Sequence, residues 1–230
     1  MIRAVLFDLD NTIVDYIRFK TTCINAAVKA MIREGLPLSV EESREIFIHI
    51  FKRTKMEERD IFQKFLKLSI NKVDPRLLAV GIVAYRRARA NAYHVYPGIK
   101  KVLRYLKSRG IKVGIVTDAP RLKAWIRLVE IGLQNKFDVV VTYDDSKAEK
   151  PSKKPFLMAL KKLGVRPEEA MFVGDNVDRD VVGSKRVGMT SVFAKYGEVL
   201  LFRRKKSTVE PDFTISRPTD IITILKKNSL

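Results

Sequence analysis

The hydrophobic positions of the chain follow two different periods. Short apolar runs of strand length, rich in Val, Ile and Phe, predict strands at residues 4–7, 111–117, 137–142, 170–174, 190–194 and 213–215. Between them, helical spacing predicts a helix that carries Val102, Leu103 and Leu106 and ends at Gly110, and further helices at 121–132, 155–163, 181–187 and 219–225. We expect the helix at 121–132 to bury Trp125, Leu128 and Val129. Strands alternating with helices of this length predict an α/β fold with a doubly wound, mostly parallel sheet.

Residues 16–92 differ from the rest because their period is helical throughout. Apolar residues recur at one-face spacing, as at Ile24, Ala27, Val28 and Met31. Capping boxes at Ser39–Glu42 and Asp60–Gln63, and proline after Asp74, predict three further helix starts. The pattern predicts a helical cap domain of four helices at 16–92, inserted into a core domain formed by 1–15 and 93–230.

The composition suits a globular chain with a strong basic excess. Hydrophobic residues make up 46% and charged residues 31% of the 230 positions, and the net charge is +19. A basic excess fits nucleic-acid binding, the charged surface of a heat-adapted protein, or steering of anionic substrates. The basic residues are scattered, with short clusters at 86–87, 100–101 and 203–206, and no nucleic-acid-binding motif accompanies them. We therefore expect no specific nucleic-acid partner.

Compartment and assembly are constrained only loosely. No apolar run approaches the roughly 20 residues that cross a bilayer, so no membrane association is expected. The chain enters a strand at once, which does not resemble a signal peptide. The single cysteine, Cys23, excludes an internal disulfide and favours a reducing, cytoplasmic location, with Cys23 as a small packing residue. Monomer and homodimer both remain open.

Candidate chemistry begins directly after the first strand. Asp8 follows the apolar run and Asp10 lies two residues further on. If the extended conformation persists, alternation directs both carboxylates to the same side. Two converging carboxylates repel each other unless a cation or proton lies between them, which predicts a site for a hard metal such as Mg²⁺. The alternative is a pair of exposed turn aspartates.

Polar residues also follow later strands. Thr117 and Asp118 could bind a phosphate oxygen through a hydroxyl and backbone N–H groups, and the Lys150 ammonium could neutralise a phosphoryl group. Gly174 permits a tight turn before Asp175, a further metal-ligand candidate, and Asp180 follows at a helix start. Each has a plain alternative: a strand-end cap, a surface lysine or a helix N-cap. Their joint placement at strand ends favours a site.

These motifs resemble those of haloacid dehalogenase (HAD) superfamily hydrolases of subfamily I. The resemblance covers Asp8-Leu9-Asp10-Asn11-Thr12, Thr117, Lys150-Pro151, and Gly174-Asp175 with Asp180 in the stretch up to Met189. The resemblance extends over the whole core. It implies that the core is a Rossmann-like α/β domain. The helical insertion resembles the family's C1-type cap.

The resemblance implies a mechanism as well as a fold. Asp8 would be the nucleophile that forms an aspartyl-phosphate, and Asp10 the general acid and base. Mg²⁺ would be held by Asp8, the backbone carbonyl of Asp10 and Asp175. Thr117 and the amide of Asp118 would bind phosphate, and Lys150 would bridge phosphate and nucleophile. Asp180 would orient a metal-bound water or Lys150, and Thr12 would be a further residue that supports the groups in contact with phosphate and metal.

The carboxylate at position 10 also indicates the type of reaction. Members that displace a halide lack it because a halide needs no proton, whereas an alkoxide does. We therefore expect a Mg²⁺-dependent phosphatase of a small phosphorylated metabolite such as a sugar or triose phosphate. A phosphomutase, or a relative that binds anions or nucleic acid without catalysis, are the alternatives.

Substrate preference is the least determined property. Asp118 stands where asparagine is common in the family, Ser152-Lys153 where Asp-Pro is usual, and Asn176 where serine is common. Specificity would come from the cap, with Tyr16, Phe19, Lys20 and Arg53 as candidate residues.

Overall fold

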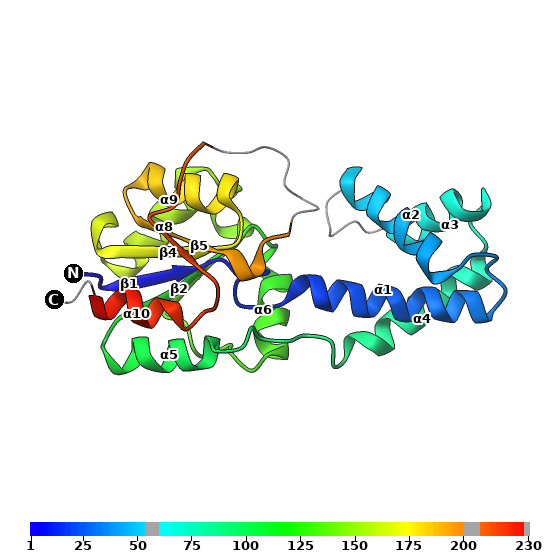
Figure 1. Cartoon of the computed structure of the whole chain (residues 1–230), viewed down its shortest axis with the longest axis horizontal. Coiled ribbons are helices and arrows are strands. Elements are labelled where there is room, and N and C mark those ends of the chain that lie inside the picture. Colours follow the sequence, from blue (N-terminus) through cyan, green and yellow to red (C-terminus); the bar gives the residue numbers. More distant parts are fainter. Residues whose placement is uncertain (54–59, 200–207, 228–230) are drawn as a thin grey trace. The chain divides into compact units, whose positions relative to one another are not determined.

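The computed structural model describes residues 1–53, 60–199 and 208–227 (Figure 1). Two compact units emerge: a core unit, Met1–Tyr16 with His94–Leu230, and a helical unit, Ile17–Tyr93. The boundaries expected from the sequence, 15/16 and 92/93, lie one residue away from these. The basic run at 203–206 lies outside the described residues.

Six parallel strands form one sheet in the described part of the core unit. They are β1 (Ala4–Phe7), β2 (Lys112–Val116), β3 (Val139–Val141), β4 (Ala170–Gly174), β5 (Thr190–Ala194) and β6 (Phe213–Ile215). Their order is β3-β2-β1-β4-β5-β6, and every neighbouring pair is parallel. The predicted α/β fold with a doubly wound sheet is confirmed. The strand order reverses between β1 and β4, and the carboxyl ends at such a point form the usual ligand-binding crevice.

Helices cover both faces of this sheet. They are α5 (Ile99–Ser108), α6 (Arg121–Glu130), α7 (Tyr143–Ser146), α8 (Lys153–Leu163), α9 (Val182–Val187) and α10 (Asp220–Lys227), with short helical turns η1 (Pro167–Glu169), η2 (Val177–Val181) and η3 (Lys195–Gly197). α5 and α10 lie on one face, and α8 and α9 on the other (Figure 1). Phe156 and Leu160 of α8 pack with Leu6 and Phe172 of the sheet. The strands read as unbroken apolar runs because they are covered on both sides.

Helix α6 corrects one sequence expectation. Leu128 is buried as expected, but Trp125 is 38% exposed and Val129 57% exposed. The buried positions are Ala124, Arg127 and Leu128. The buried stripe is shifted by one residue because an arginine occupies a core-facing position, which a hydrophobic pattern does not predict.

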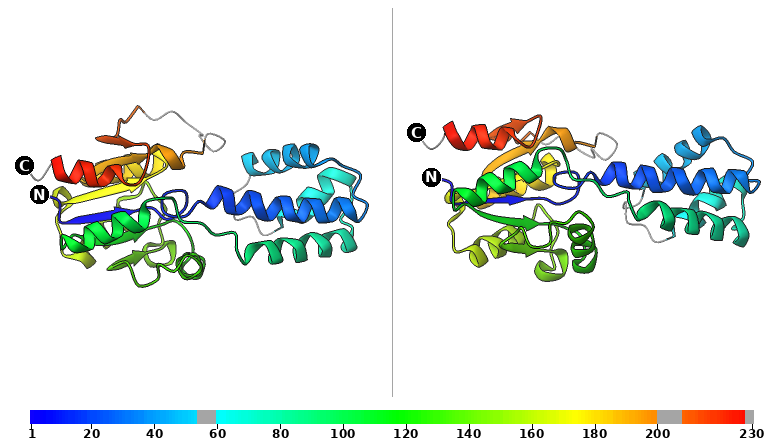
Figure 2. Two further views of the ribbon diagram at one scale, coloured as in Figure 1. Left: turned by 60° about the horizontal axis from the view of Figure 1, so that its bottom comes forward. Right: turned by 90° about the horizontal axis from the view of Figure 1, so that it is seen from below.

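The helical unit contains four described helices, as predicted: α1 (Tyr16–Arg33), α2 (Val40–Arg53), α3 (Ile61–Ile70) and α4 (Pro75–Arg89). α1 and α4 lie side by side in both views of Figure 2, and Gly81 allows α4 to approach Met31 closely. Two predicted starts are confirmed: Ser39 and Glu42 cap each other's backbone N–H, and Asp74 accepts from Arg76 and Leu77.

The third predicted helix start is wrong in its detail. Asp60 precedes α3, but its side chain makes no capping hydrogen bond. Its backbone, with φ −101° and ψ 32°, is outside the extended region that places an N-cap side chain over the first turn.

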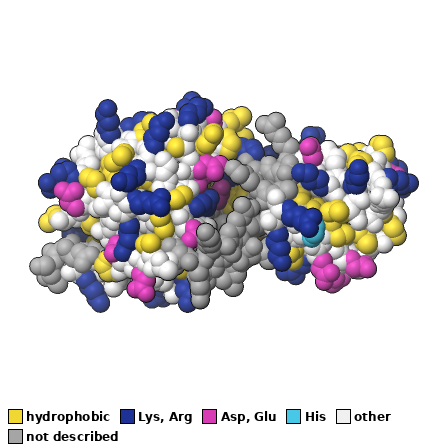
Figure 3. All heavy atoms as spheres, turned by 90° about the horizontal axis from the view of Figure 1, so that it is seen from above, with side chains coloured by type: hydrophobic (Ala, Val, Ile, Leu, Met, Phe, Trp, Pro, Cys, Tyr) yellow, Lys and Arg dark blue, Asp and Glu magenta, His cyan; other side chains and the backbone are white. Residues whose placement is uncertain are grey.

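Basic side chains are spread over the face of each unit seen in Figure 3. Among the described helices, none combines the length and apolar character needed to span a membrane.

Gly114 of β2 lies where the neighbouring side chains leave no room for a larger residue. A methyl group there would meet Leu6 of β1 and lie 2.6 Å from Val139 Cγ1. Overpacking a well-filled core typically costs about 1–3 kcal/mol. We expect Gly114→Ala to lower the free energy of unfolding by about that amount, measured by urea denaturation.

A second substitution provides the control for Gly114→Ala. Val139→Ala removes one of the two opposing groups, so the double variant should lose less stability than the sum of the single variants. Strict additivity would mean that the clash is not the cause.

Candidate active site

The polar residues predicted at strand ends gather at the carboxyl edge of the sheet. Asp8 follows β1, and its backbone N–H donates to the carbonyl of Val173 in β4 at 2.9 Å. Thr117 and Asp175 follow β2 and β4. The three side chains, together with Lys150, are at most 7% exposed. The alternative of exposed turn or surface groups is therefore wrong for these four residues.

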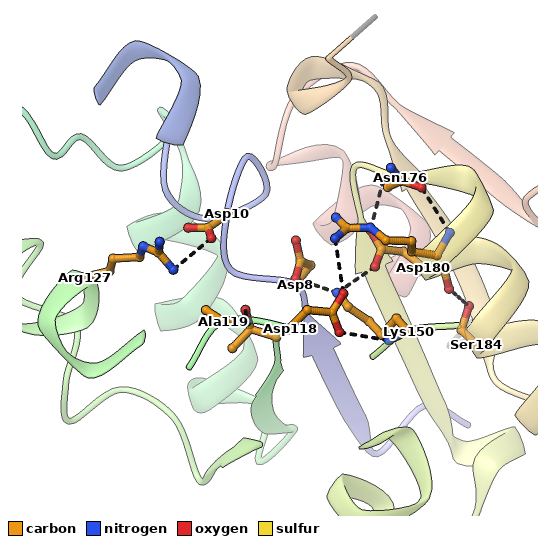
Figure 4. A network of polar contacts seen from close by, with 11 residues as sticks. Asp8, Asp10, Asp118, Ala119, Arg127, Lys150, Asn176, Asp180 and Ser184 are labelled. Atoms are coloured by element: carbon orange, nitrogen blue, oxygen red, sulfur yellow. Dashed lines mark hydrogen bonds and ion pairs between the residues drawn. The ribbon is translucent and has the colours of Figure 1, made fainter. Parts of the chain in front are cut away.

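Lys150 lies at the centre of this group. Its Nζ is 2.6 Å from Asp8 Oδ1 and 2.7 Å from Asp180 Oδ1 (Figure 4). Burial alone would lower the pKa of Lys150, but the carboxylates of Asp180 and Asp8 outweigh it and hold the pKa above its ordinary value. Lys150 is therefore a charged ammonium bound to Asp8.

Three buried carboxylates, Asp8, Asp175 and Asp180, could hold a metal ion. One oxygen from each lies within 4.8 Å of the others. Burial, then the charges of Asp8 and Asp180, raise the pKa of Asp175 well above its ordinary value. Asp175 Oδ1 is buried and has no hydrogen-bond partner among the described residues. An orphaned carboxylate oxygen in an excess of negative charge fits a hard divalent cation such as Mg²⁺.

Asp180 differs from Asp175 in that the protein already engages both of its oxygens. Oδ1 is paired with Lys150, and Oδ2 accepts from the backbone N–H of Asn176 at 3.0 Å. Its carbonyl also accepts from the Ser184 hydroxyl. Gly174 is required beside it, because a methyl group at Gly174 would collide with the Asp180 side chain. Asp180 is suited to orienting Lys150.

Asp10 corrects the expectation that both carboxylates of the first motif point the same way. The strand ends at Phe7, and Asn11 adopts a left-handed conformation with φ 59°, so the extended form does not persist. Asp8 is directed to Lys150, whereas Asp10 is directed to Arg127 (Figure 4). Asp10 Oδ2 is 3.0 Å from Arg127 Nη1.

Arg127 is the only arginine among the buried side chains of the described residues. Its guanidinium also lies over the ring of Tyr16, 4.4 Å from the centroid. Hydrophobic periodicity missed this residue, and the signal that could have found it was a basic residue within the buried stripe of α6.

Asp118 links the backbone of Lys150 to the guanidinium of Arg179. Its Oδ1 accepts from the backbone N–H of Lys150 at 2.9 Å, and its Oδ2 is 3.2 Å from Arg179 Nη1 (Figure 4). Thr117 Oγ1 accepts from the backbone N–H of Ala119. The aspartate found where asparagine is common thus has a cationic partner, Arg179, which lies inside the fourth motif and was not singled out from the sequence.

The segment after β5 closes over the first motif. The Tyr196 hydroxyl donates to the carbonyl of Thr12 at 2.8 Å, and Thr12 is fully buried. A methyl group at Gly197 would collide with the carbonyl oxygen of Asn11 and lie 3.0 Å from Asp175 Cβ. Sequence analysis did not predict this contact, because a close backbone approach leaves no periodic signal.

The four candidate specificity residues have different environments. Tyr16 and Phe19 are buried, Tyr16 under Arg127 and Phe19 stacked on Tyr93 at 3.9 Å. Lys20 lies near the ring of Tyr85, and Arg53 is exposed at the end of α2. Tyr16 and Phe19 thus also contribute to packing, and a role of any of the four residues in specificity stays a prediction.

Comparisons with known proteins agree with this geometry. Residues 2–188 match the family model of haloacid dehalogenase-like hydrolases. A glyceraldehyde 3-phosphate phosphatase of Methanocaldococcus jannaschii is 32% identical, with 98% of each chain covered, and one from Methanopyrus kandleri is 32% identical, covering 99% of this chain and 98% of its own. The crystal structure of a HAD phosphatase from Thermococcus onnurineus superimposes with a TM-score of 0.68 at 31% identity, covering 97% of this chain and 98% of that one. The chain belongs to the haloacid dehalogenase-like hydrolases.

Proposed function

We propose that this chain is a Mg²⁺-dependent phosphatase whose substrate is a triose phosphate, with glyceraldehyde 3-phosphate the first compound to test. Family membership and phosphatase relatives that match the full chain make it a phosphoric monoester hydrolase of small phosphorylated metabolites. The triose is taken from the two curated relatives. The observation that carries the proposal is the buried pair of Asp8 and Lys150 beside the orphaned oxygen of Asp175.

Asp8 is the proposed nucleophile. One of its oxygens is bound to Lys150 in a buried site, so the carboxylate is fixed at the end of β1. Its attack forms a bond from the carboxylate oxygen to phosphorus and breaks the bond from phosphorus to the leaving oxygen. The Lys150 ammonium, with the hydroxyl of Thr117 and nearby backbone N–H groups, stabilises the charge on the phosphoryl oxygens.

Asp10 is the proposed proton carrier. It gives a proton to the leaving alkoxide, and in the second half of the cycle it takes a proton from the water that attacks the aspartyl-phosphate. The products are the alcohol and inorganic phosphate, and Asp8 returns to its ionised form.

Asp8, Asp175 and the backbone carbonyl of Asp10 are the groups that would hold Mg²⁺. Bound there, the ion would supply positive charge to the phosphate oxygens and offset the carboxylate cluster. Asp180 would stay outside the metal shell, because its oxygens serve Lys150 and Asn176.

Assembly and location complete the proposal. We expect a cytoplasmic monomer or homodimer without a specific nucleic-acid partner. The single cysteine, Cys23, is a buried thiol, which is consistent with a reducing compartment.

The substrate proposal predicts a selective profile in phosphate release. With Mg²⁺, glyceraldehyde 3-phosphate should give the highest kcat/KM in a panel that also holds phosphoglycolate, glycerol 3-phosphate and hexose 1-phosphates. Conversion of a hexose 1-phosphate to the 6-phosphate without free phosphate would indicate the phosphomutase instead. A flat profile would contradict the triose assignment.

The nucleophile assignment predicts loss of turnover in Asp8→Asn, by ~10³-fold or more, because the amide cannot form the acyl-phosphate. Acid-quenched wild-type enzyme should carry phosphate on Asp8, detectable by mass spectrometry, and the variant should carry none. Asp144→Asn is the matched control and should keep normal turnover, because this half-buried carboxylate contacts only the backbone N–H of Arg121 and the ammonium of Lys147 in the interactions described. Undiminished hydrolysis by Asp8→Asn would disprove the mechanism.

The metal assignment predicts opposite effects of Asp175→Asn on the two forms of the protein. Without metal, the variant should be more stable than wild type near pH 7, because it removes a buried charge repelled by Asp8 and Asp180. At a Mg²⁺ concentration of roughly 5–10 mM, chosen to exceed the Kd of the ion, wild type should gain thermal stability and the variant should not. Differential scanning fluorimetry measures both, and an unchanged Mg²⁺ response in Asp175→Asn would remove Asp175 from the metal site.

A further inference from the structure

Arg127 is a buried cationic side chain of the core unit, as Lys150 is, but it pairs with a different carboxylate. Its side chain is 2% exposed, and Nη1 lies 3.0 Å from Asp10 Oδ2. It projects from α6, whereas Asp10 lies on the loop after β1 and Tyr16 begins α1. The guanidinium thus joins α6 to the first motif and the adjoining start of α1, which are distant from α6 in the sequence.

The geometry fixes the guanidinium firmly. The side chain leaves a buried position of α6, and the Tyr16 ring covers the guanidinium at 4.4 Å. A cation over an aromatic face is attracted by the electron-rich ring, and the attraction is stronger in a desolvated position. Because a guanidinium keeps its proton at any working pH, Arg127 is a permanent and well-placed anchor for the carboxylate of Asp10.

We propose that Arg127 is a positioning residue for proton transfer by Asp10. It holds one carboxylate oxygen and sets the direction of the carboxyl group, so that Asp10 can deliver its proton from the other oxygen. The proton passes from the Asp10 carboxyl to the leaving oxygen as the bond to phosphorus breaks. This inference rests on the proposed function of Asp10 and adds the element that positions it.

The proposal predicts an effect that depends on the leaving group. An alkoxide is a strong base and needs a proton as it departs, whereas 4-nitrophenolate is stable without one. Loss of a correctly oriented acid should therefore slow an alkyl phosphate much more than 4-nitrophenyl phosphate. The parameter kcat/KM isolates this step, because it excludes the later hydrolysis of the aspartyl-phosphate.

The experiment compares Arg127→Met with wild type in the presence of Mg²⁺, using glyceraldehyde 3-phosphate and 4-nitrophenyl phosphate. We expect kcat/KM for the alkyl ester to fall roughly 10- to 100-fold, within the range that general acid catalysis contributes, and for the aryl ester about threefold or less. The ratio of the two values does not depend on the fraction of folded enzyme. Arg127→Lys keeps the buried charge, should fold even if Arg127→Met does not, and should recover part of the ratio.

Two further variants complete the design. Arg121→Met makes the same substitution on the same helix, at an exposed pair with Asp145, and should leave the ratio unchanged. Asp10→Asn should show the same leaving-group dependence as Arg127→Met, and the double variant should lose no more on the alkyl ester than Asp10→Asn alone.

The outcomes separate the two levels of the proposal. In the first case, Asp10→Asn slows the alkyl ester more than the aryl ester, but the Arg127 variants lose equally on both esters or lose nothing. That result would overturn the positioning role of Arg127. If Asp10→Asn itself does not discriminate, Asp10 is not the acid, and the proposed mechanism fails together with the role of Arg127. If wild type hydrolyses neither ester, the proposed function fails.

Discussion

Burial of negative charge at one edge of the sheet is the constraint on which the rest of the structure depends. Three carboxylates, those of Asp8, Asp175 and Asp180, lie within 4.8 Å of one another, and Lys150 is the ammonium that touches two of them. Carboxylates so placed repel each other in a medium of low dielectric. Burial, together with the charges of Asp8 and Asp180, raises the pKa of Asp175 well above its ordinary value, so the one ammonium in contact with the cluster does not balance it. A divalent cation bound between Asp8 and Asp175, as we propose, would offset this excess of negative charge.

The sheet topology and its main polar residues could be predicted because their signals are local. Short apolar runs identified every described strand, and the residues that follow three of them, Asp8, Thr117 and Asp175, lie at one edge because parallel strands end together. Capping at Ser39 and Asp74 was equally local. The position of Lys150 in the site could not be predicted from its own neighbourhood in the sequence. It was expected only because the other motif residues occur with it, and the structure shows the side chain buried.

The features that escaped prediction are those in which distant residues override a local rule. Trp125 and Val129 fit an apolar stripe, but Arg127 occupies the buried side of α6 since Asp10 provides its counter-charge. Asp10 itself turns from the direction of Asp8 because Asn11 leaves the extended region. Asp118 and Arg179 are 61 residues apart, and nothing in either neighbourhood indicates the other. Such pairs become visible only when the fold places them together.

The two buried lysine and arginine side chains suggest how one short motif can hold two carboxylates with different tasks. A buried ion pair contributes little net stability, because desolvation of both groups offsets most of their attraction. Its more general effect is to fix geometry. Lys150 holds Asp8 from the loop before α8, and Arg127 holds Asp10 from α6. Since Asp8 and Asp10 are paired with different cations on different elements of the core, the proposed nucleophile and the proposed proton carrier need not share a counter-charge, although only one residue separates them in the sequence.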